Sequence, residues 1–405
     1  MDLIDILNKK IPHTSQATNG IRSVVFYQTD ECKNLIREAC NFEGFSLPEF
    51  QPLSDDNVTA YGQQEGIEII VVELNESRDL VVDAERICHL LPNSASVIIV
   101  GKEDSISTIR RLRSLVLYYL FWPVTKDEFI DFTLGVYRNR EANSGIGLVR
   151  KAKQISFLGC KGGVGNTFVC AEISRYFSKE KHSSCVVVDN AYHGGNIDIM
   201  MGIEGFEKRE VRPGSQVLNL DDAASQSLLK KQSSSLSVLS LTSPELEIDE
   251  IKQFTKAAAG HLSQTNNFLL EDLLNTNNLI YNVRELIELS NCIVLTFSPS
   301  VSSLREAGKF KRKLDDGLGL DSSVRIIMVM NCLLPNGDAT VSQEEAEKFL
   351  KCPVDIVIPH IKKLDHKLLE GKSIISHGGK PARALEDLGA LILGEERKSS
   401  NGWFR

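Results

Sequence analysis

The feature that most limits the possible folds is a glycine-rich segment, Cys160–Thr167, with the sequence CKGGVGNT. An apolar run, Gln154–Leu158, precedes it and an amphipathic stretch, Phe168–Phe177, follows it. A glycine-rich turn between a strand and a helix lets backbone N–H groups converge on phosphate oxygens, and the helix N-terminus adds its dipole. The pattern therefore predicts an α/β fold with a loop that descends from a phosphate-binding site.

The chain length of 405 residues allows two ordinary domains. Apolar runs alternate with amphipathic stretches through most of the chain, and this alternation predicts two doubly wound parallel-sheet domains. We assign residues 1–137 to the first domain, 138–153 to a polar, basic linker and 154–405 to the second domain. Strands are predicted at Ser23–Tyr27, Ile67–Val72, Ser96–Val100 and Leu117–Phe121, and then at Gln154–Leu158, Cys185–Asp189, Leu236–Leu241, Phe268–Leu270, Cys292–Phe297, Ile326–Met330 and Asp355–Ile358.

Charge and cysteine usage narrow the class of protein. The formal net charge of -8 argues against general binding to nucleic-acid phosphates, which needs a basic face. Nine cysteines without a CxxC pair predict buried free thiols in a reducing compartment and give no support to a metal site. No segment has the pattern of a secretory signal or of a bilayer-spanning helix. We expect a cytoplasmic protein whose membrane contacts are peripheral or made through partners.

The glycine-rich loop departs from a working P-loop at two positions. The residue before Thr167 is Asn166 where a P-loop has lysine, and Cys160 stands at the first glycine. Loss of one charge-stabilising donor typically costs about 10²–10³ in rate. The segment KGGVGNT resembles the deviant Walker A motif of the MinD/ParA family. That resemblance implies ATP and magnesium as cofactors, a homodimer in which Lys161 reaches the γ-phosphate of the partner's nucleotide, and nucleotide-binding residues Lys161, Gly162, Gly163, Val164, Gly165, Asn166 and Thr167.

The same resemblance identifies candidate metal ligands. Asp189 matches the family's magnesium-binding aspartate. The family has a second carboxylate after a later strand, and here either Glu271 or Asp272, which follow the predicted strand Phe268–Leu270, could supply it. We assign the metal to Thr167, Asp189 and Glu271, with Asp272 as the open alternative. The family's water-positioning aspartate corresponds to Ala191, so no catalytic residue is assigned and little or no ATP hydrolysis is expected.

Two later positions also match the family. Asn331 ends an apolar run where the family has its adenine-recognising asparagine, and Pro359 belongs to an Ile-Pro pair at the end of a later strand. Both are assigned to nucleotide binding through this resemblance.

The first domain resembles a response-regulator receiver domain, which accepts a phosphoryl group on an aspartate. Here the acceptor position holds Glu73, the conserved lysine position holds Trp122, and the acidic pair is reduced to Asp30. We therefore predict a receiver-like domain that is not phosphorylated. The Trp122-Pro123 pair could form an exposed protein contact or pack inside the domain.

A receiver-like domain followed by a MinD/ParA-like domain resembles the TadZ and CpaE family. This resemblance implies a scaffold that localises the secretion machinery of tight-adherence (Flp) pili, at the cell pole or the inner face of the membrane. Its expected partners are pilus and secretion proteins. The main alternative is an active MinD/ParA-type ATPase for partitioning or positioning, and a signalling output protein is a third possibility. Asn166, Ala191 and the acidic net charge oppose the main alternative.

Overall fold

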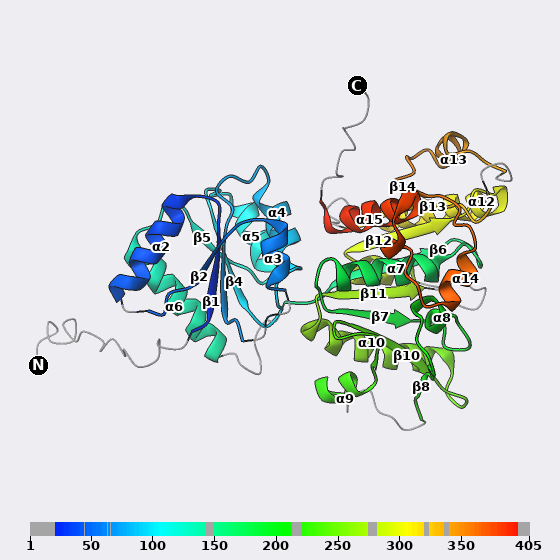
Figure 1. Ribbon diagram of the computed structural model, residues 1–405, viewed down its shortest axis with the longest axis horizontal. Coiled ribbons are helices and arrows are strands. Elements are labelled where there is room, and N and C mark those ends of the chain that lie inside the picture. The colour runs from blue at the N-terminus through cyan, green and yellow to red at the C-terminus, as the bar shows by residue number, and fades with distance from the viewer. Residues whose placement is uncertain are drawn as a thin grey trace, which may run out of the picture. The chain divides into compact units, whose positions relative to one another are not determined.

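The computed structural model describes residues 21–43, 45–62, 64, 66–142, 150–212, 220–273, 282–319, 324–335 and 340–395. The chain forms two compact units, each with its own parallel sheet (Figure 1). One unit comprises Met1–Val58, Gln64–Glu85 and Ser94–Val149, and the other comprises Thr59–Gln63, Arg86–Asn93 and Arg150–Arg405. The α/β prediction with two parallel sheets is confirmed.

The first sheet has five parallel strands in the order β2-β1-β3-β4-β5, which is the order of flavodoxin-like folds. They are β1 (Ser23–Tyr27), β2 (Glu49–Pro52), β3 (Ile69–Glu73), β4 (Ser96–Gly101) and β5 (Tyr118–Phe121). The sequence predicted all of them except β2. That strand lies at the sheet edge, where a proline is tolerated, and it lacks the buried apolar run that marks a central strand.

Five helices accompany this sheet: α2 (Asp30–Glu43), α3 (Asp55–Ala60), α4 (Leu80–Cys88), α5 (Ile106–Ser114) and α6 (Lys126–Ala142). Helices α2 and α6 lie on one face of the sheet, and α4 and α5 lie on the other (Figure 1). Trp122 is 5% exposed and belongs to the apolar cluster beneath α2 and α6, so it packs inside the unit. Helix α6 continues to Ala142, into the segment predicted as linker.

The second sheet has nine strands, and their order places the glycine-rich loop near its centre. The order is β14-β13-β12-β6-β11-β7-β10-β8, with β9 paired to β10 as the one antiparallel pairing among the described strands. The strands are β6 (Lys153–Gly159), β7 (Cys185–Asp189), β8 (Arg209–Glu210), β9 (Lys230–Lys231), β10 (Leu236–Thr242), β11 (Phe268–Leu273), β12 (Cys292–Phe297), β13 (Arg325–Asn331) and β14 (Ile356–Ile358). All the predicted strands are present. The sequence missed β8 and β9, because two residues are too few to show a period.

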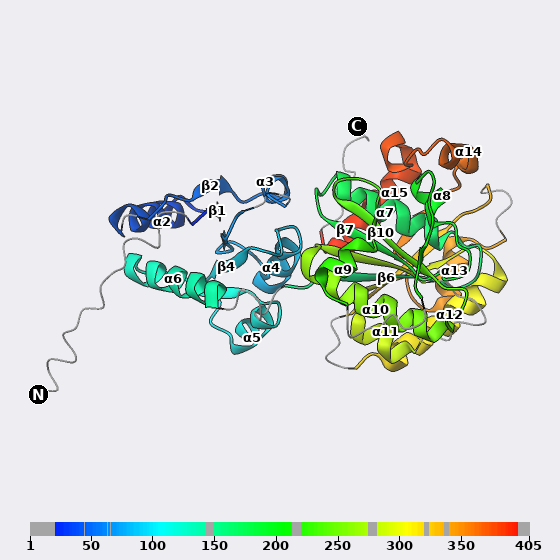
Figure 2. The ribbon, with the colours of Figure 1, turned by 90° about the horizontal axis from the view of Figure 1, so that it is seen from below.

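Helices cover both faces of the second sheet. They are α7 (Asn166–Lys179), α8 (Ile197–Met201), α9 (Asp222–Ser227), α10 (Ile248–Thr265), α11 (Val283–Leu289), α12 (Val301–Gly317), α13 (Gln343–Leu350), α14 (Leu364–Leu369), the 3-10 helix η2 (Ile375–His377) and α15 (Gly379–Leu393). Figure 2 shows α7, α8 and α15 on one face and α10, α11 and α12 on the other. Leu385, Leu388 and Ile392 are buried, so α15 is a core helix.

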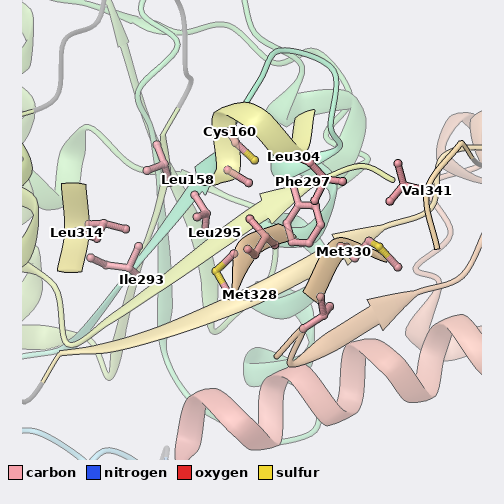
Figure 3. Close-up of a cluster of buried hydrophobic side chains, with 14 of the residues drawn as sticks. Leu158, Cys160, Ile293, Leu295, Phe297, Leu304, Leu314, Met328, Met330 and Val341 are labelled. Atoms are coloured by element: carbon pink, nitrogen blue, oxygen red, sulfur yellow. The ribbon is translucent and has the colours of Figure 1, made fainter. Parts of the chain in front are cut away.

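An apolar cluster lies beneath α12 and supports the loop region (Figure 3). Leu295 and Phe297 of β12 and Met330 of β13 are its central members, and each is at most 3% exposed. All nine cysteines are free and eight are buried, as predicted. In the parts of the chain that the structure describes, no helix is both long and apolar enough to cross a bilayer.

Candidate functional site

The glycine-rich loop joins β6 to α7 at the carboxyl ends of the parallel strands. Because β11 and β12 flank β6 on opposite sides, the loop lies where the strand order reverses, which is the usual ligand position in such sheets. Gly163 and Gly165 adopt left-handed φ values of 79° and 84°. A Cβ at Gly162 or Gly163 would have nothing within 4 Å, whereas one at Gly165 would overlap the Asn331 side chain. The rim of the loop is thus open and its base is packed.

Cys160 lies at the start of this loop but does not face its rim. Its thiol is buried and donates to the carbonyl oxygen of Thr296 at 2.8 Å. Figure 3 shows the side chain within the apolar cluster, near Leu304. A non-glycine residue is tolerated here because its side chain enters the core.

Asn166 occupies the position of the P-loop lysine, and its side chain is turned inward. Its Nδ2 donates to the carbonyl oxygen of Phe157 and to Oδ1 of Asp272, both at 2.8 Å. The residue is 7% exposed, and its Oδ1 has no hydrogen-bond partner among the described residues. The amide therefore ties the first turn of α7 to β6 and β11, and it supplies no positive charge.

The two acidic residues of β11 face opposite sides of the sheet. Asp272 is 1% exposed, accepts a hydrogen bond from Asn166 Nδ2 and lies on the same side of the sheet as Thr167. Glu271 lies within 3.4 Å of Ser156 Oγ, on the side of α10 and α11. The metal assignment to Glu271 does not fit this geometry, because alternation along the strand turns it away from Thr167. The alternative, Asp272, is the carboxylate of β11 that faces the loop.

Burial dominates the electrostatics of Asp272. It raises the pKa of this carboxyl to about 7; hydrogen bonds from Thr167 and Asn166 oppose the rise, and the nearby Asp189 charge adds to it. A neutral asparagine in place of the P-loop lysine contributes to this state, because it brings no charge that would hold Asp272 ionised.

Asp189 ends β7 and is paired with a lysine that the sequence did not identify. Its Oδ2 accepts from Lys208 Nζ at 2.6 Å and from Ser240 Oγ at 2.7 Å, and its Oδ1 accepts from the backbone N–H of Ala191 at 3.0 Å. Lys208 also donates to the carbonyl oxygen of Ala191 at 2.5 Å. Ala191 is 4% exposed and contributes only backbone atoms, so the water-positioning carboxylate is missing from this position.

The remaining candidate residues surround the loop. Lys161 is exposed, and its Nζ donates to Ser302 Oγ at 3.1 Å. Asn331 is 4% exposed, and its Nδ2 donates to the carbonyl oxygen of Val164 at 2.9 Å. Pro359 directly follows β14, whose Ile358 pairs with Asn331. Asn331 therefore supports the loop from the strand β13, and its contact with adenine stays a prediction.

The loop and the carboxylates differ in how well they suit ATP and magnesium. The open rim at Gly162 and Gly163, the exposed Lys161 and the start of α7 suit an anion. The metal position does not suit magnesium, because an ammonium group already contacts the Asp189 carboxylate. Within the described ranges, no group of three or more His, Cys, Asp or Glu residues could hold a metal ion.

The first unit has a second possible site where its strand order reverses, between β1 and β3. Glu73 is fully buried there and accepts from the backbone N–H groups of Gln28 and Thr29 at 2.7 and 2.9 Å. The Thr29 hydroxyl and Asn75 Nδ2 also donate to it, at 2.6 and 2.7 Å. The Asp30 side chain is 86% exposed and points elsewhere. Glu73 is thus an internal acceptor with its hydrogen bonds satisfied.

The fold and the site define a parallel α/β protein with a glycine-rich strand–loop–helix segment beside two buried carboxylates, Asp189 and Asp272. No protein-family model matches the sequence, and no curated protein matches it. The chain is similar to a solved ParA family ATPase from Chlorobium tepidum TLS, with 18% identity and a TM-score of 0.49 over 58% of this chain and 98% of that chain.

The cell division ATPase MinD from Pyrococcus furiosus is another similar structure, with 20% identity and a TM-score of 0.45 over 60% of this chain and 98% of that chain. The MinC:MinD complex of Aquifex aeolicus gives 22% identity and a TM-score of 0.46 over 60% of this chain and 97% of that chain. All three identities lie below 25% and all three TM-scores lie below 0.5.

Proposed function

We propose that this protein is a scaffold and localisation factor built on an ATPase-like domain that hydrolyses little or no ATP. The observation that carries the proposal is the inward position of Asn166, whose amide binds Phe157 and Asp272 within the protein. The group that would neutralise the phosphates of a nucleotide is therefore replaced by one that braces the fold. A scaffold needs the surfaces of such a domain and does not need its turnover.

Two further features support suppressed hydrolysis. Ala191 offers no side-chain base or acceptor to a water molecule, and Asp189 is engaged by Lys208. Each missing charge-stabilising or water-orienting group lowers a rate by about 10²–10³. The loss of both groups would lower turnover by about 10⁴–10⁶.

ATP remains the ligand that the loop would take. The backbone N–H groups of residues 161–167 would hold its phosphates, with Lys161 and Thr167 as the polar side chains beside them. Asn331 and Pro359 would border the base. ATP would supply the negative charge that draws these groups together. The Lys161 ammonium is exposed and donates to Ser302 Oγ, so it could turn towards a nucleotide in a second copy.

The specific role that we propose is in assembly of the tight-adherence (Flp) pilus. The support is the combination of a receiver-like first domain with an altered Walker A motif, which resembles the TadZ and CpaE family. The protein would act as a homodimer at the inner face of the membrane or the cell pole, and the first domain would dock pilus and secretion proteins. Active partitioning is not favoured, because its chemistry needs the charges that Asn166 and Ala191 lack.

Phosphate release and pilus assembly, measured on matched variants, test this proposal. Purified protein should release phosphate from ATP no faster than the Thr167→Ala variant. In the source organism, removal of the gene should abolish surface pili. Expression of the wild type or of Ala191→Gly should restore them. Ala191→Gly is a control, because this position already lacks a functional side chain. Turnover that disappears in Thr167→Ala would overturn the scaffold proposal, and normal piliation without the gene would overturn the pilus role.

A further inference from the structure

Lys208 lies at the carboxylate that the fold would offer to a divalent metal. Its ammonium contacts Asp189 Oδ2 at 2.6 Å, and the two side chains are 17% and 2% exposed. A buried carboxylate needs a counter-charge, since an unpaired one is strongly destabilising. In this chain the counter-charge comes from a side chain that is part of the fold.

The position of Lys208 is fixed by the sheet. The strand β8 begins at the next residue, Arg209, and pairs with Leu241 and Thr242 of β10. Asp189 pairs with Ser240 on the same strand β10. Because both partners are held by one strand, the ammonium and the carboxylate meet at the same end of the sheet.

Gly195 leaves the space that the ammonium uses. Its φ is 99°, and a Cβ there would lie 3.6 Å from Lys208 Nζ, 3.7 Å from Asp189 Oδ1 and 2.9 Å from the Ala191 Cβ. A Cβ at this position would overlap the Ala191 methyl group and would contact both members of the ion pair. Gly195, Ala191 and Lys208 therefore pack together around the Asp189 carboxylate.

A magnesium ion would compete for the same atoms. Magnesium binds carboxylate oxygens at about 2.0–2.1 Å in a strict octahedron. Oδ2 of Asp189 already accepts from Lys208 and Ser240, and Oδ1 accepts from the backbone. A doubly charged ion placed there would also meet the ammonium charge at short range.

We propose that Lys208 is a built-in cation that takes the place of the divalent metal, so that the Asp189 and Asp272 carboxylates do not bind magnesium in the wild-type protein. The inference rests on the geometry of the site and is independent of the pilus role. It makes Lys208 a positioning residue for Asp189 and a determinant of metal specificity.

Manganese, a paramagnetic substitute for magnesium, is the probe for the test. Electron paramagnetic resonance measures the free Mn²⁺ as the metal is titrated into each full-length protein. The proteins are wild type, Asp189→Asn, Lys208→Met, the Lys208→Met/Asp189→Asn double variant and Lys231→Met. The last variant is a control that removes an exposed lysine of β9. Wild type, Asp189→Asn and Lys231→Met should bind Mn²⁺ equally weakly. Lys208→Met should gain one site at least about tenfold tighter, and the double variant should lose it.

Two results would overturn the inference. One is a manganese site in wild type that disappears in Asp189→Asn. This comparison does not use Lys208→Met, so it remains valid even if that variant fails to fold. The other is a folded Lys208→Met protein, by circular dichroism, that gains no site. The readout is metal binding alone, so a failed pilus or turnover experiment leaves its meaning unchanged.

Discussion

At the scale of single residues, the chemistry of the candidate site in the second unit depends on which side chains beside it carry a positive charge. Asn166 brings none to the loop, and Lys208 brings one to Asp189 from a distant segment. Asp272 lies between the neutral amide of Asn166 and the carboxylate of Asp189, which is already paired with Lys208, and it is 1% exposed. Burial therefore controls its protonation, and this has a consequence for stability.

Stability should fall as the pH rises from about 4 to 7, because burial raises the pKa of Asp272 from 3.8 to about 7. In that window the native protein keeps a proton that the unfolded chain has released, and each unit of pKa shift corresponds to about 1.4 kcal/mol. Asp272→Asn keeps the acceptor for Asn166 and removes the titration. Urea unfolding at several pH values should show the variant gaining about 2–4 kcal/mol over wild type between pH 4 and pH 8.

The variant is compared with wild type because other groups titrate in the same range and cancel in the difference. Parallel stability curves for the two proteins would contradict the prediction. They would mean that Asp272 is ionised in the native protein near neutral pH.

Glu73 gives a second prediction at the residue scale, for phosphorylation of the first unit. Its carboxylate is fully buried and accepts four hydrogen bonds, so it offers no free oxygen to a phosphoryl donor. Incubation with acetyl phosphate and magnesium should give no phosphorylated species by intact-protein mass spectrometry. Glu73→Asp should also stay unmodified, because Trp122 is buried apolar surface where an active receiver has a lysine.

A mass increase of one phosphoryl group on wild type, lost in Glu73→Gln, would contradict this prediction. It would show that the carboxylate leaves its internal donors readily enough to react.

At the scale of elements, the sequence was more informative about strands than about side-chain direction. Short, mostly apolar runs located β7, β11 and β12, because buried parallel strands are apolar on both faces, although only Phe268–Leu270 of β11 was predicted. The same runs could not say whether Glu271 or Asp272 faces the loop. Alternation separates the two faces, but only the packed position of α7 decides which face is which.

Lys208 lay beyond sequence reasoning for a related reason. It is 19 residues from Asp189, next to a two-residue strand that has no recognisable pattern. Only the pairing of β8 with β10 brings it to the site. By contrast, Asn166, Thr167 and Asp189 were found because motif spacing and strand ends fix them locally.

The contact between α7 and α15 supports a prediction about paired glycine substitutions. A Cβ at Gly389 of α15 would lie 2.5 Å from the Tyr176 ring of α7, whereas one at Gly260 of α10 would have nothing within 4 Å. Gly389→Ala should lower the free energy of unfolding by about 1–3 kcal/mol through overpacking. Gly260→Ala should raise it by about 0.5–1 kcal/mol, since alanine favours the helix.

Urea unfolding followed by circular dichroism measures both changes, and each variant serves as the control for the other. A rise in stability for both variants would contradict the overpacking prediction, because it would show that helix propensity determines the outcome and that the two helices can separate to admit a methyl group.

At the scale of the whole molecule, the two units share one physical feature. Each has a ligand position where the strand order of its sheet reverses, and in each a buried carboxylate at or near that position is paired with groups of the same chain. In the first unit the donors of Gln28 and Thr29 bind Glu73, and in the second Lys208 binds Asp189. Such internal pairing favours a protein that presents surfaces over one that switches by phosphorylation or metal binding.

The net charge gives the last prediction, which separates a scaffold from a DNA-partitioning protein. With 46 basic and 54 acidic residues, the chain has no excess positive charge with which to displace counterions from a duplex. A gel-shift assay with a mixed-sequence duplex at roughly 0.15 M salt should show no complex, with or without ATP. Lowering the salt to roughly 0.05 M sharpens the test, because each true phosphate contact steepens the gain in affinity. An ATP-dependent complex that weakens steeply with salt would instead favour partitioning, and would mean that a local basic surface outweighs the net charge.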